Sequence, residues 1–134
     1  MKNRMKKVTY RPLSNYEQNV LLPILMKGLG MKKGKLNAVT NKQIVHSVRK
    51  HGVRISSSSV SLLINHIRTN DLMVGLMATS YGYFVSSSEQ ELVDYEKSLM
   101  SREVALRKVR MSMQRQRKTM FAQMAEREAQ SQLF

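Results

Sequence analysis

The 52 residues that follow Gly82 contain neither proline nor glycine, so no residue there is expected to interrupt a helix. A capping box of Ser87 or Ser88 with Glu91 predicts where the helix begins, and it can run to about Gln130. At ~1.5 Å per residue its length is roughly 60 Å, more than the width of a domain built from the ~85 residues before it. Part of this helix must therefore leave the globule, and the core must come from the preceding residues.

A seven-residue repeat runs along this predicted helix. Its first column is Leu92, Leu99, Leu106, Met113 and Met120, and its second is Tyr95, Arg102, Val109, Gln116 and Gln123. A full coiled coil needs both columns apolar, and only Tyr95 and Val109 qualify in the second. We therefore expect a partial seam that joins two copies of the chain through Leu92, Leu99, Leu106, Val109 and Met113. The alternative is that 92–109 pack on the chain's own head and the rest is a basic helix.

The clearest amphipathic stretch runs from Ser56 to Asn70. Its apolar residues recur at helical spacing on one face, and they are Val60, Leu63, Ile64 and Ile67. Ser56 is placed to cap this helix. The other face is polar and lacks carboxylates, and it is made of Ser57, Ser58, Ser61, Leu62, Asn65, His66, Arg68 and Thr69. A helix with such a face fits the DNA major groove, where base edges offer donors and acceptors.

Two further capping boxes predict two earlier helices. Ser14 with Glu17 opens the first, which runs to about Leu29 with a kink expected at Pro23. Its expected buried side is Val20, Leu21, Ile24, Leu25 and Gly28. Thr40 with Gln43 opens the second, which runs to about His51 and ends at Gly52. Its expected inward residues are Ile44, Val45 and Val48.

The connections complete a recognisable order of elements. Val39 is predicted as a strand of about one residue, and 52–56 form the turn that joins two helices as a helix-turn-helix. Two short apolar runs, 72–78 and 83–85, lie on either side of Thr79–Gly82 and predict a β-hairpin.

Positive charge indicates a polyanionic partner. The formal net charge is +14, and such a balance is typical of proteins that bind nucleic acid. Residues 1–12 carry five basic residues without apolar periodicity, and we interpret them as a flexible basic arm. Phosphate contacts are expected from the cations around the helix-turn-helix, namely Lys32, Lys33, Lys35, Lys42, Arg49, Lys50 and Arg54.

Residues 13–86 resemble a winged-helix DNA-binding domain of the kind found in small phage and mobile-element proteins. The resemblance rests on the capping boxes Ser14/Glu17 and Thr40/Gln43, the faces Ile44/Val48 and Val60/Ile64/Ile67, the hairpin 72–85, and the stretch from Ile67 to Tyr83. It implies a mainly α fold, a winged helix-turn-helix with a short β-hairpin wing, followed by the long C-terminal helix at 87–134.

The same resemblance implies which residues touch DNA. It places Ser57, Ser58, Ser61, Leu62 and Asn65 near bases, and Thr79, Ser80 and Tyr81 at the wing tip, although this wing carries no lysine or arginine. Asn65 suits adenine and Arg68 suits guanine. We expect modest selectivity from one copy, and a dimer that reads two half-sites of double-stranded DNA.

Other chemistry finds little support in the sequence. The chain has no cysteine, and His46, His51 and His66 lack the spacing of metal ligands. We expect no catalysis, no metal and no cofactor. Neither a membrane span nor a secretory signal is apparent, so the expected location is the cytoplasm of a bacterial or phage-infected cell, in association with the nucleoid.

Two alternatives to duplex binding remain open. The first is a structural protein that docks on a larger assembly, for which the methionines of the last helix offer an adaptable surface; these are Met100, Met111, Met113, Met120 and Met124. The second is RNA binding, which is weaker because few aromatic residues are placed to stack bases. The basic residues of 102–118 form either a further nucleic-acid surface or a solvated helix face; they are Arg102, Arg107, Lys108, Arg110, Arg115, Arg117 and Lys118.

Overall fold

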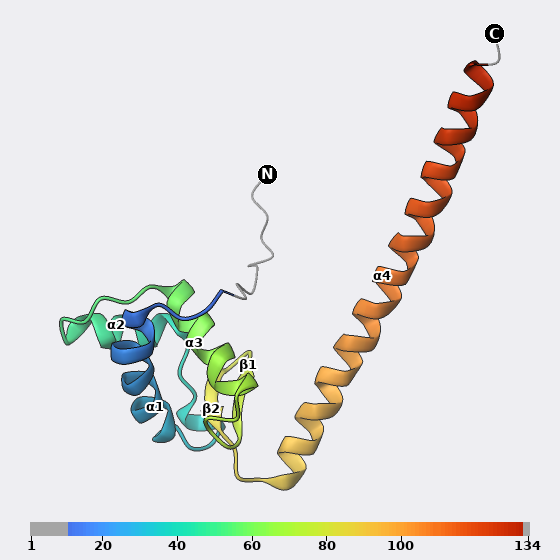
Figure 1. The fold of residues 1–134 in the computed structure, drawn as a ribbon. Helices are drawn as coiled ribbons and strands as arrows, with labels where there is room; N and C mark the ends of the chain where they lie inside the picture. Colours follow the sequence, from blue (N-terminus) through green and yellow to red (C-terminus); the bar gives the residue numbers. More distant parts are fainter. Residues whose placement is uncertain (1–10, 133–134) are drawn as a thin grey trace. The chain divides into compact units, whose positions relative to one another are not determined.

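The computed structural model describes residues 11–132 and is mainly helical, with one small antiparallel sheet and a long C-terminal helix (Figure 1). Contacts divide the described chain after Leu92 into two units, and we call residues 11–92 the head. Of the predicted basic arm, only Arg11 and Pro12 lie within the described residues.

The first helical stretch begins as its capping box predicts. The backbone amide of Glu17 donates to Ser14 Oγ (3.1 Å), and the amide of Ser14 donates to the Glu17 carboxylate (2.9 Å). A π-helical segment, Glu17–Leu21, comes first and α1, Leu22–Gly30, follows. Pro23 has no amide hydrogen, so the disturbance expected there coincides with the change from π to α hydrogen bonding.

The buried face of this helix differs from the predicted one. Leu21 and Leu25 are buried as expected, and so are Leu22 and Leu29. Val20 (38% exposed) and Ile24 (36%) face outward, as does Gly28, so their placement in the core was wrong. Apolar residues are nearly continuous over 20–26 and cannot fix the phase of a helix, and each π turn takes up one residue more than an α turn.

The second helix, α2 (Asn41–Lys50), confirms its predicted cap and end. The Gln43 amide donates to Thr40 Oγ1 (3.2 Å), and the Thr40 amide donates to Gln43 Oε1 (2.9 Å). At the other end Gly52 adopts a φ of 80°, and the amide of Val53 reaches back to the carbonyl of Val48. This left-handed residue is the usual way for a helix to stop and turn.

The third helix, α3 (Ser57–Thr69), contributes four of the eleven residues in the buried core cluster, as many as the first helical stretch. Ser56 caps it by accepting from the amide of Ser59 (3.1 Å). The predicted apolar stripe is confirmed, because Val60, Leu63, Ile64 and Ile67 are each at most 2% exposed. They pack with the buried leucines of the first helix, with Ile44 and Ile55, and with Leu76 of the hairpin.

The hairpin consists of β1 (Leu76–Thr79) and β2 (Gly82–Val85), paired from Leu76–Val85 to Thr79–Gly82. Val39 forms an antiparallel bridge to Tyr83 on the other edge of β2, which confirms a strand of one residue. The first apolar run was predicted as a strand from Leu72, but pairing begins only at Leu76.

Residues 71–75 serve as the exit from α3 rather than as strand. Asp71 adopts a φ of 55°, and the amide of Leu72 bonds the carbonyl of Ile67. Gly75 follows with a φ of 81°, and a Cβ there would lie 2.3 Å from the carbonyl oxygen of Ser86. Only glycine fits a backbone approach this close.

The last helix, α4 (Glu89–Ser131), has 43 residues and confirms the predicted start and end within a residue or two. Ser88 Oγ accepts from the amide of Glu91 (3.2 Å) at its beginning. No side chain along α4 is buried, and every residue from Glu96 to Arg110 is exposed.

Candidate nucleic-acid interface

One side of α3 carries a continuous polar edge, which we define as Ser57, Ser61, Asn65 and Arg68. These positions are four, four and three residues apart and therefore lie along one side of a helix. Ser57 is exposed, and the other three are half-buried. The edge starts at the N-terminus of α3 and includes four of the six residues predicted to contact bases; a fifth, exposed Ser58, lies beside it.

The polar edge is tied to two other elements by hydrogen bonds. Asn41, the first residue of α2, donates from Nδ2 to Ser61 Oγ (2.9 Å) and to Ser57 Oγ (3.4 Å). Tyr83 of β2 donates its hydroxyl to Asn41 Oδ1 (2.6 Å). The amide of Asn41 thus has a fixed orientation, and the N-terminus of α2, one side of α3 and the middle of the hairpin form one polar surface.

Burial keeps the Tyr83 hydroxyl protonated, so that it can donate a hydrogen bond. Burial raises the pKa of Tyr83 above its usual value, and the hydrogen bond with Ser61 and the positive charge of Arg68 oppose this rise. The hydroxyl is therefore protonated at neutral pH. The same relation shows that Arg68 lies near Tyr83, although it comes late in α3.

Leu62 does not belong to this surface. Its side chain is 7% exposed, so its predicted place on the outward face was wrong. With Met77 and Phe84 it is buried outside the main core cluster. Periodicity assigns a helix a single apolar stripe, whereas α3 has buried side chains on two sides.

The predicted phosphate-binding cations are exposed, apart from half-buried Lys32. Lys42 follows Asn41 directly. Arg49 also has a structural task, because its Nε donates to the carbonyl of Ile55 (2.9 Å) in the turn before α3. Arg54 places its guanidinium 4.7 Å from the centre of the Tyr16 ring.

The hairpin tip obtains a positive charge from another segment. Lys35 Nζ lies 3.9 Å from the centre of the Tyr81 ring, a distance at which cation–π attraction acts. Tyr81 is 59% exposed, Ser80 is exposed and Thr79 is half-buried. The predicted wing residues therefore stand next to a lysine, even though none occurs in the hairpin itself.

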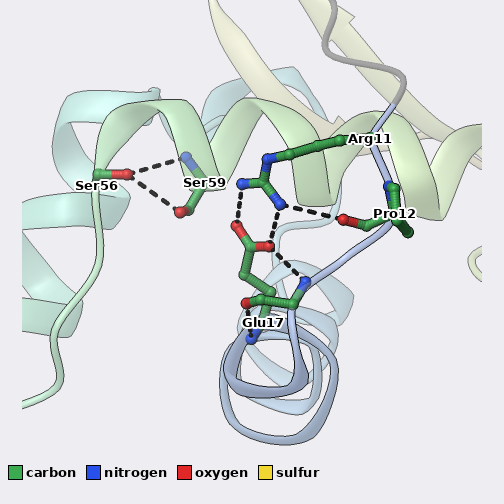
Figure 2. A network of polar contacts seen from close by, with 6 residues as sticks. Arg11, Pro12, Glu17, Ser56 and Ser59 are labelled. Atoms are coloured by element: carbon green, nitrogen blue, oxygen red, sulfur yellow. Dashed lines mark hydrogen bonds and ion pairs between the residues drawn. The ribbon is translucent and has the colours of Figure 1, made fainter.

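A buried carboxylate anchors the start of α3 from the side of the first helix (Figure 2). Glu17 is 3% exposed and pairs with Arg11 through two bonds of 2.7 and 2.9 Å. The Arg11 guanidinium, together with hydrogen bonds from Ser14 and Ser59, lowers the pKa of Glu17 to about 2. Because Ser59 belongs to the first turn of α3, this ion pair helps to fix where the polar edge begins.

A second surface feature is an open groove of about 820 Å³ between α1 and α2. Its lining includes Ile24, Leu36, Ser47, Val48 and His51. The groove has a largely apolar floor, and it explains why Ile24 can face outward without being surrounded by water on all sides.

Sequence reasoning missed Asn41 and Tyr83, which organise the polar edge. Asn41 directly follows the Thr40 cap and has no capping task of its own, and that was a usable signal. Tyr83 lies in a predicted strand, and strand alternation separates it from its neighbour Phe84 but does not indicate which distant residue its hydroxyl meets. The bond between them joins residues 42 positions apart, and local patterns do not report such contacts.

No protein-family model, curated protein or solved structure matches this chain. Within residues 11–132, no group of three or more histidine or acidic side chains is arranged to hold a metal ion. In the same part of the chain, no helix combines the length and apolar character that crossing a membrane requires.

Proposed function

We propose that this protein binds double-stranded DNA through the polar edge of α3, as a transcriptional regulator or a replication accessory. The proposed fold of the head is a winged helix-turn-helix, in which α2 and α3 form the helix-turn-helix and β1–β2 form the wing. The proposed partners are duplex DNA and, through α4, a second copy of the chain.

Element order supports the winged-helix proposal. The head runs from a first helix through the bridge residue Val39 to α2, α3 and the hairpin. The bridge between Val39 and Tyr83 adds a third chain segment to the sheet. The turn between α2 and α3 begins at a left-handed glycine, Gly52, as is common in helix-turn-helix units.

The observation that carries the proposal is the hydrogen-bonded polar edge itself. Two serines of the edge, Ser57 and Ser61, accept hydrogen bonds from Asn41, which the Tyr83 hydroxyl orients, and Ser57 lies at the exposed N-terminus of α3. Hydroxyl and side-chain amide groups can donate hydrogen bonds to base edges and accept hydrogen bonds from them. A surface that is already ordered loses little side-chain entropy on binding.

Charge around the edge has the sign that DNA requires. Residues 11–86 contain ten lysines and arginines but only two acids, Glu17 and Asp71. Glu17 is neutralised by Arg11. Lysine and arginine contacts to phosphates supply affinity that falls as salt rises, whereas base contacts supply selectivity.

A matched pair of charge variants tests the proposal. Ser58→Glu places a carboxylate at the second position of α3, where the helix dipole favours it, so the head should fold normally. Ser47→Glu makes the same chemical change in the groove between α1 and α2. We expect Ser58→Glu to weaken duplex binding at least tenfold and Ser47→Glu to change it less than about threefold.

The measurement is fluorescence anisotropy with random duplex, single-stranded DNA and RNA at two salt concentrations. The proposal expects preference for the duplex and a negative salt slope that Ser58→Glu reduces. Equal losses in both variants would mean that only net charge matters, and the polar edge would have no specific role.

A protein-docking module is the second candidate, and the apolar groove between α1 and α2 favours it. A helix or extended segment of another protein could fill this groove. Under that function no nucleic acid binds tightly, and Ser47→Glu rather than Ser58→Glu abolishes the interaction. The same two variants therefore separate the candidates.

A further inference from the structure

The apolar residues of α4 are uncovered. Leu106 is 71% exposed, Val109 60%, Met113 58% and Leu99 38%. These side chains lie along one side of α4, in the two columns of the seven-residue repeat, which we call the α4 seam. Exposed apolar side chains that gather along one side of a helix often mark a site of protein–protein contact.

Charged side chains flank the α4 seam in an ordered way. The residues directly after the second column form one margin of the seam, and four of them, spaced by seven, are charged. They are Glu96, Glu103, Arg110 and Arg117. Two acids are thus followed by two bases along one margin of the seam. None of the four forms an ion pair within the described chain.

The opposite margin carries no charge over the same length. The residues that precede the first column are Ser98, Ala105, Ser112 and Thr119. Residues at the margins of a coiled-coil seam set the choice and the orientation of the partner helix. The difference between the charged and the uncharged margin of α4 therefore indicates how a partner helix would be oriented.

We propose that α4 pairs with α4 of a second copy of this chain in antiparallel orientation, about a two-fold axis between Leu106 and Val109. In this arrangement Leu106 packs against the partner's Val109 and Val109 against the partner's Leu106. The proposal develops the self-association through α4 and does not depend on DNA binding by the head.

Charge complementarity selects the antiparallel orientation. In an antiparallel pair each margin meets the same margin of its partner, so Glu96 lies opposite the partner's Arg117 and Glu103 opposite the partner's Arg110. Two-fold symmetry repeats both contacts, which gives four attractive pairs. In a parallel pair the charged margin would face the uncharged one, and no such pair could form.

The same charges select the register. A shift of one heptad in one direction sets Glu103 against the partner's Glu103, and the opposite shift sets Arg110 against the partner's Arg110. Both shifts bring like charges together, which is destabilising. The register centred between Leu106 and Val109 avoids both.

Arg102, the cation within the α4 seam, gives a further argument. A parallel pair would place it directly against the partner's Arg102. The antiparallel register places it opposite the partner's Met113, where its aliphatic stem can cover the thioether while the guanidinium reaches water. Layers of this kind, which pair a polar with an apolar side chain, limit the stability of the dimer, so we expect it to dissociate reversibly.

Double electron–electron resonance, which measures the distance between two spin labels, tests the antiparallel orientation of the two α4 helices. The chain contains no cysteine, so single cysteines can carry spin labels without other changes. For Ala122→Cys the antiparallel register predicts a separation of roughly 45 Å between labels, from ~1.5 Å per residue. For Lys108→Cys, near the axis, it predicts less than about 20 Å. Short distances at both positions would establish a parallel pair and overturn the proposal, as would the absence of any dipolar coupling.

A charge exchange tests the register. Sedimentation equilibrium should show that Glu103→Arg and Arg110→Glu each raise the dimer Kd about fivefold to tenfold. The double variant Glu103→Arg/Arg110→Glu should return it to within about twofold, because both contacts are restored with reversed sign. Helicity at 222 nm serves as the control for folding. A monomer at all accessible concentrations, or a double variant no better than the singles, would contradict the proposal.

Discussion

Helices α3 and α4 are stabilised in opposite ways. Helix α3 has 13 residues, many of them serine or β-branched, which are weak helix formers. It exists because one stripe of its side chains is completely buried in the head. Helix α4 has 43 residues, rich in strong helix formers, and buries none of them. Tertiary contacts determine the first helix, and local preference determines the second.

This difference predicts that the same truncation has unequal effects in the two helices. Leu63→Ala in α3 removes a side chain that is 0% exposed and should lower the free energy of unfolding of the head by about 3 kcal/mol. Leu106→Ala in α4 removes one that is 71% exposed and should leave the head within ~0.5 kcal/mol of its original stability. Urea unfolding followed by the near-ultraviolet signal of the tyrosines measures both. Equal losses would refute the distinction.

Two glycines sharpen the comparison within the head. Gly75→Ala should destabilise the head by at least about 2 kcal/mol, because φ is 81° and the new Cβ would meet the Ser86 carbonyl at 2.3 Å. Gly28→Ala in α1 meets nothing within 4 Å and should stabilise by roughly 0.5–1 kcal/mol. Thermal unfolding of the two variants shows directly whether each substitution stabilises or destabilises the head. A gain in stability for both would show that the exit from α3 tolerates a side chain.

Acid should unfold the head but spare α4. The folded pKa of Glu17 is about 2, below its ordinary value of 4.5, so its contribution is complete above pH 4.5 and is lost as the pH falls toward 2. Glu17→Gln should cost roughly 2 kcal/mol at neutral pH and flatten this dependence. Glu103→Gln in α4 is the matched control. Unchanged acid sensitivity in Glu17→Gln would mean that another carboxyl is responsible.

The smallest expected effect concerns local preference in α4. Ala122→Gly should weaken the surrounding helix by about 1 kcal/mol, visible as faster amide exchange over neighbouring residues, without change in the unfolding of the head. Slower or unaltered exchange there would indicate that contacts, rather than preference, maintain this part of α4.

The sequence predicted best what depends on neighbours in the chain. The caps at Ser14, Thr40, Ser56 and Ser88 were all identified, because capping joins residues three apart. The length of α4 followed from the lack of helix breakers. The stripe of α3 was found because helical spacing is regular.

What the sequence missed depends on distant contacts. The predicted buried face of the first helix was wrong because apolar residues surround Pro23 on both sides in the sequence. The predicted exposure of Leu62 was wrong because α3 is covered on a second side. The strand expected at Leu72 was too long because Asp71, rather than a glycine, takes the left-handed position that ends α3. Asn41 and Tyr83 reach the polar edge only through the folded chain.

The most direct test of the proposed function is to map the DNA contact on the labelled full-length protein. Amide chemical shifts recorded during titration with a short duplex report which residues sense the ligand. The account predicts the largest changes at Asn41, Ser57, Ser58, Ser61 and Asn65, followed by Lys35 and Tyr81. Changes confined to α4 or to the groove between α1 and α2, with the polar edge of α3 unaffected, would contradict it.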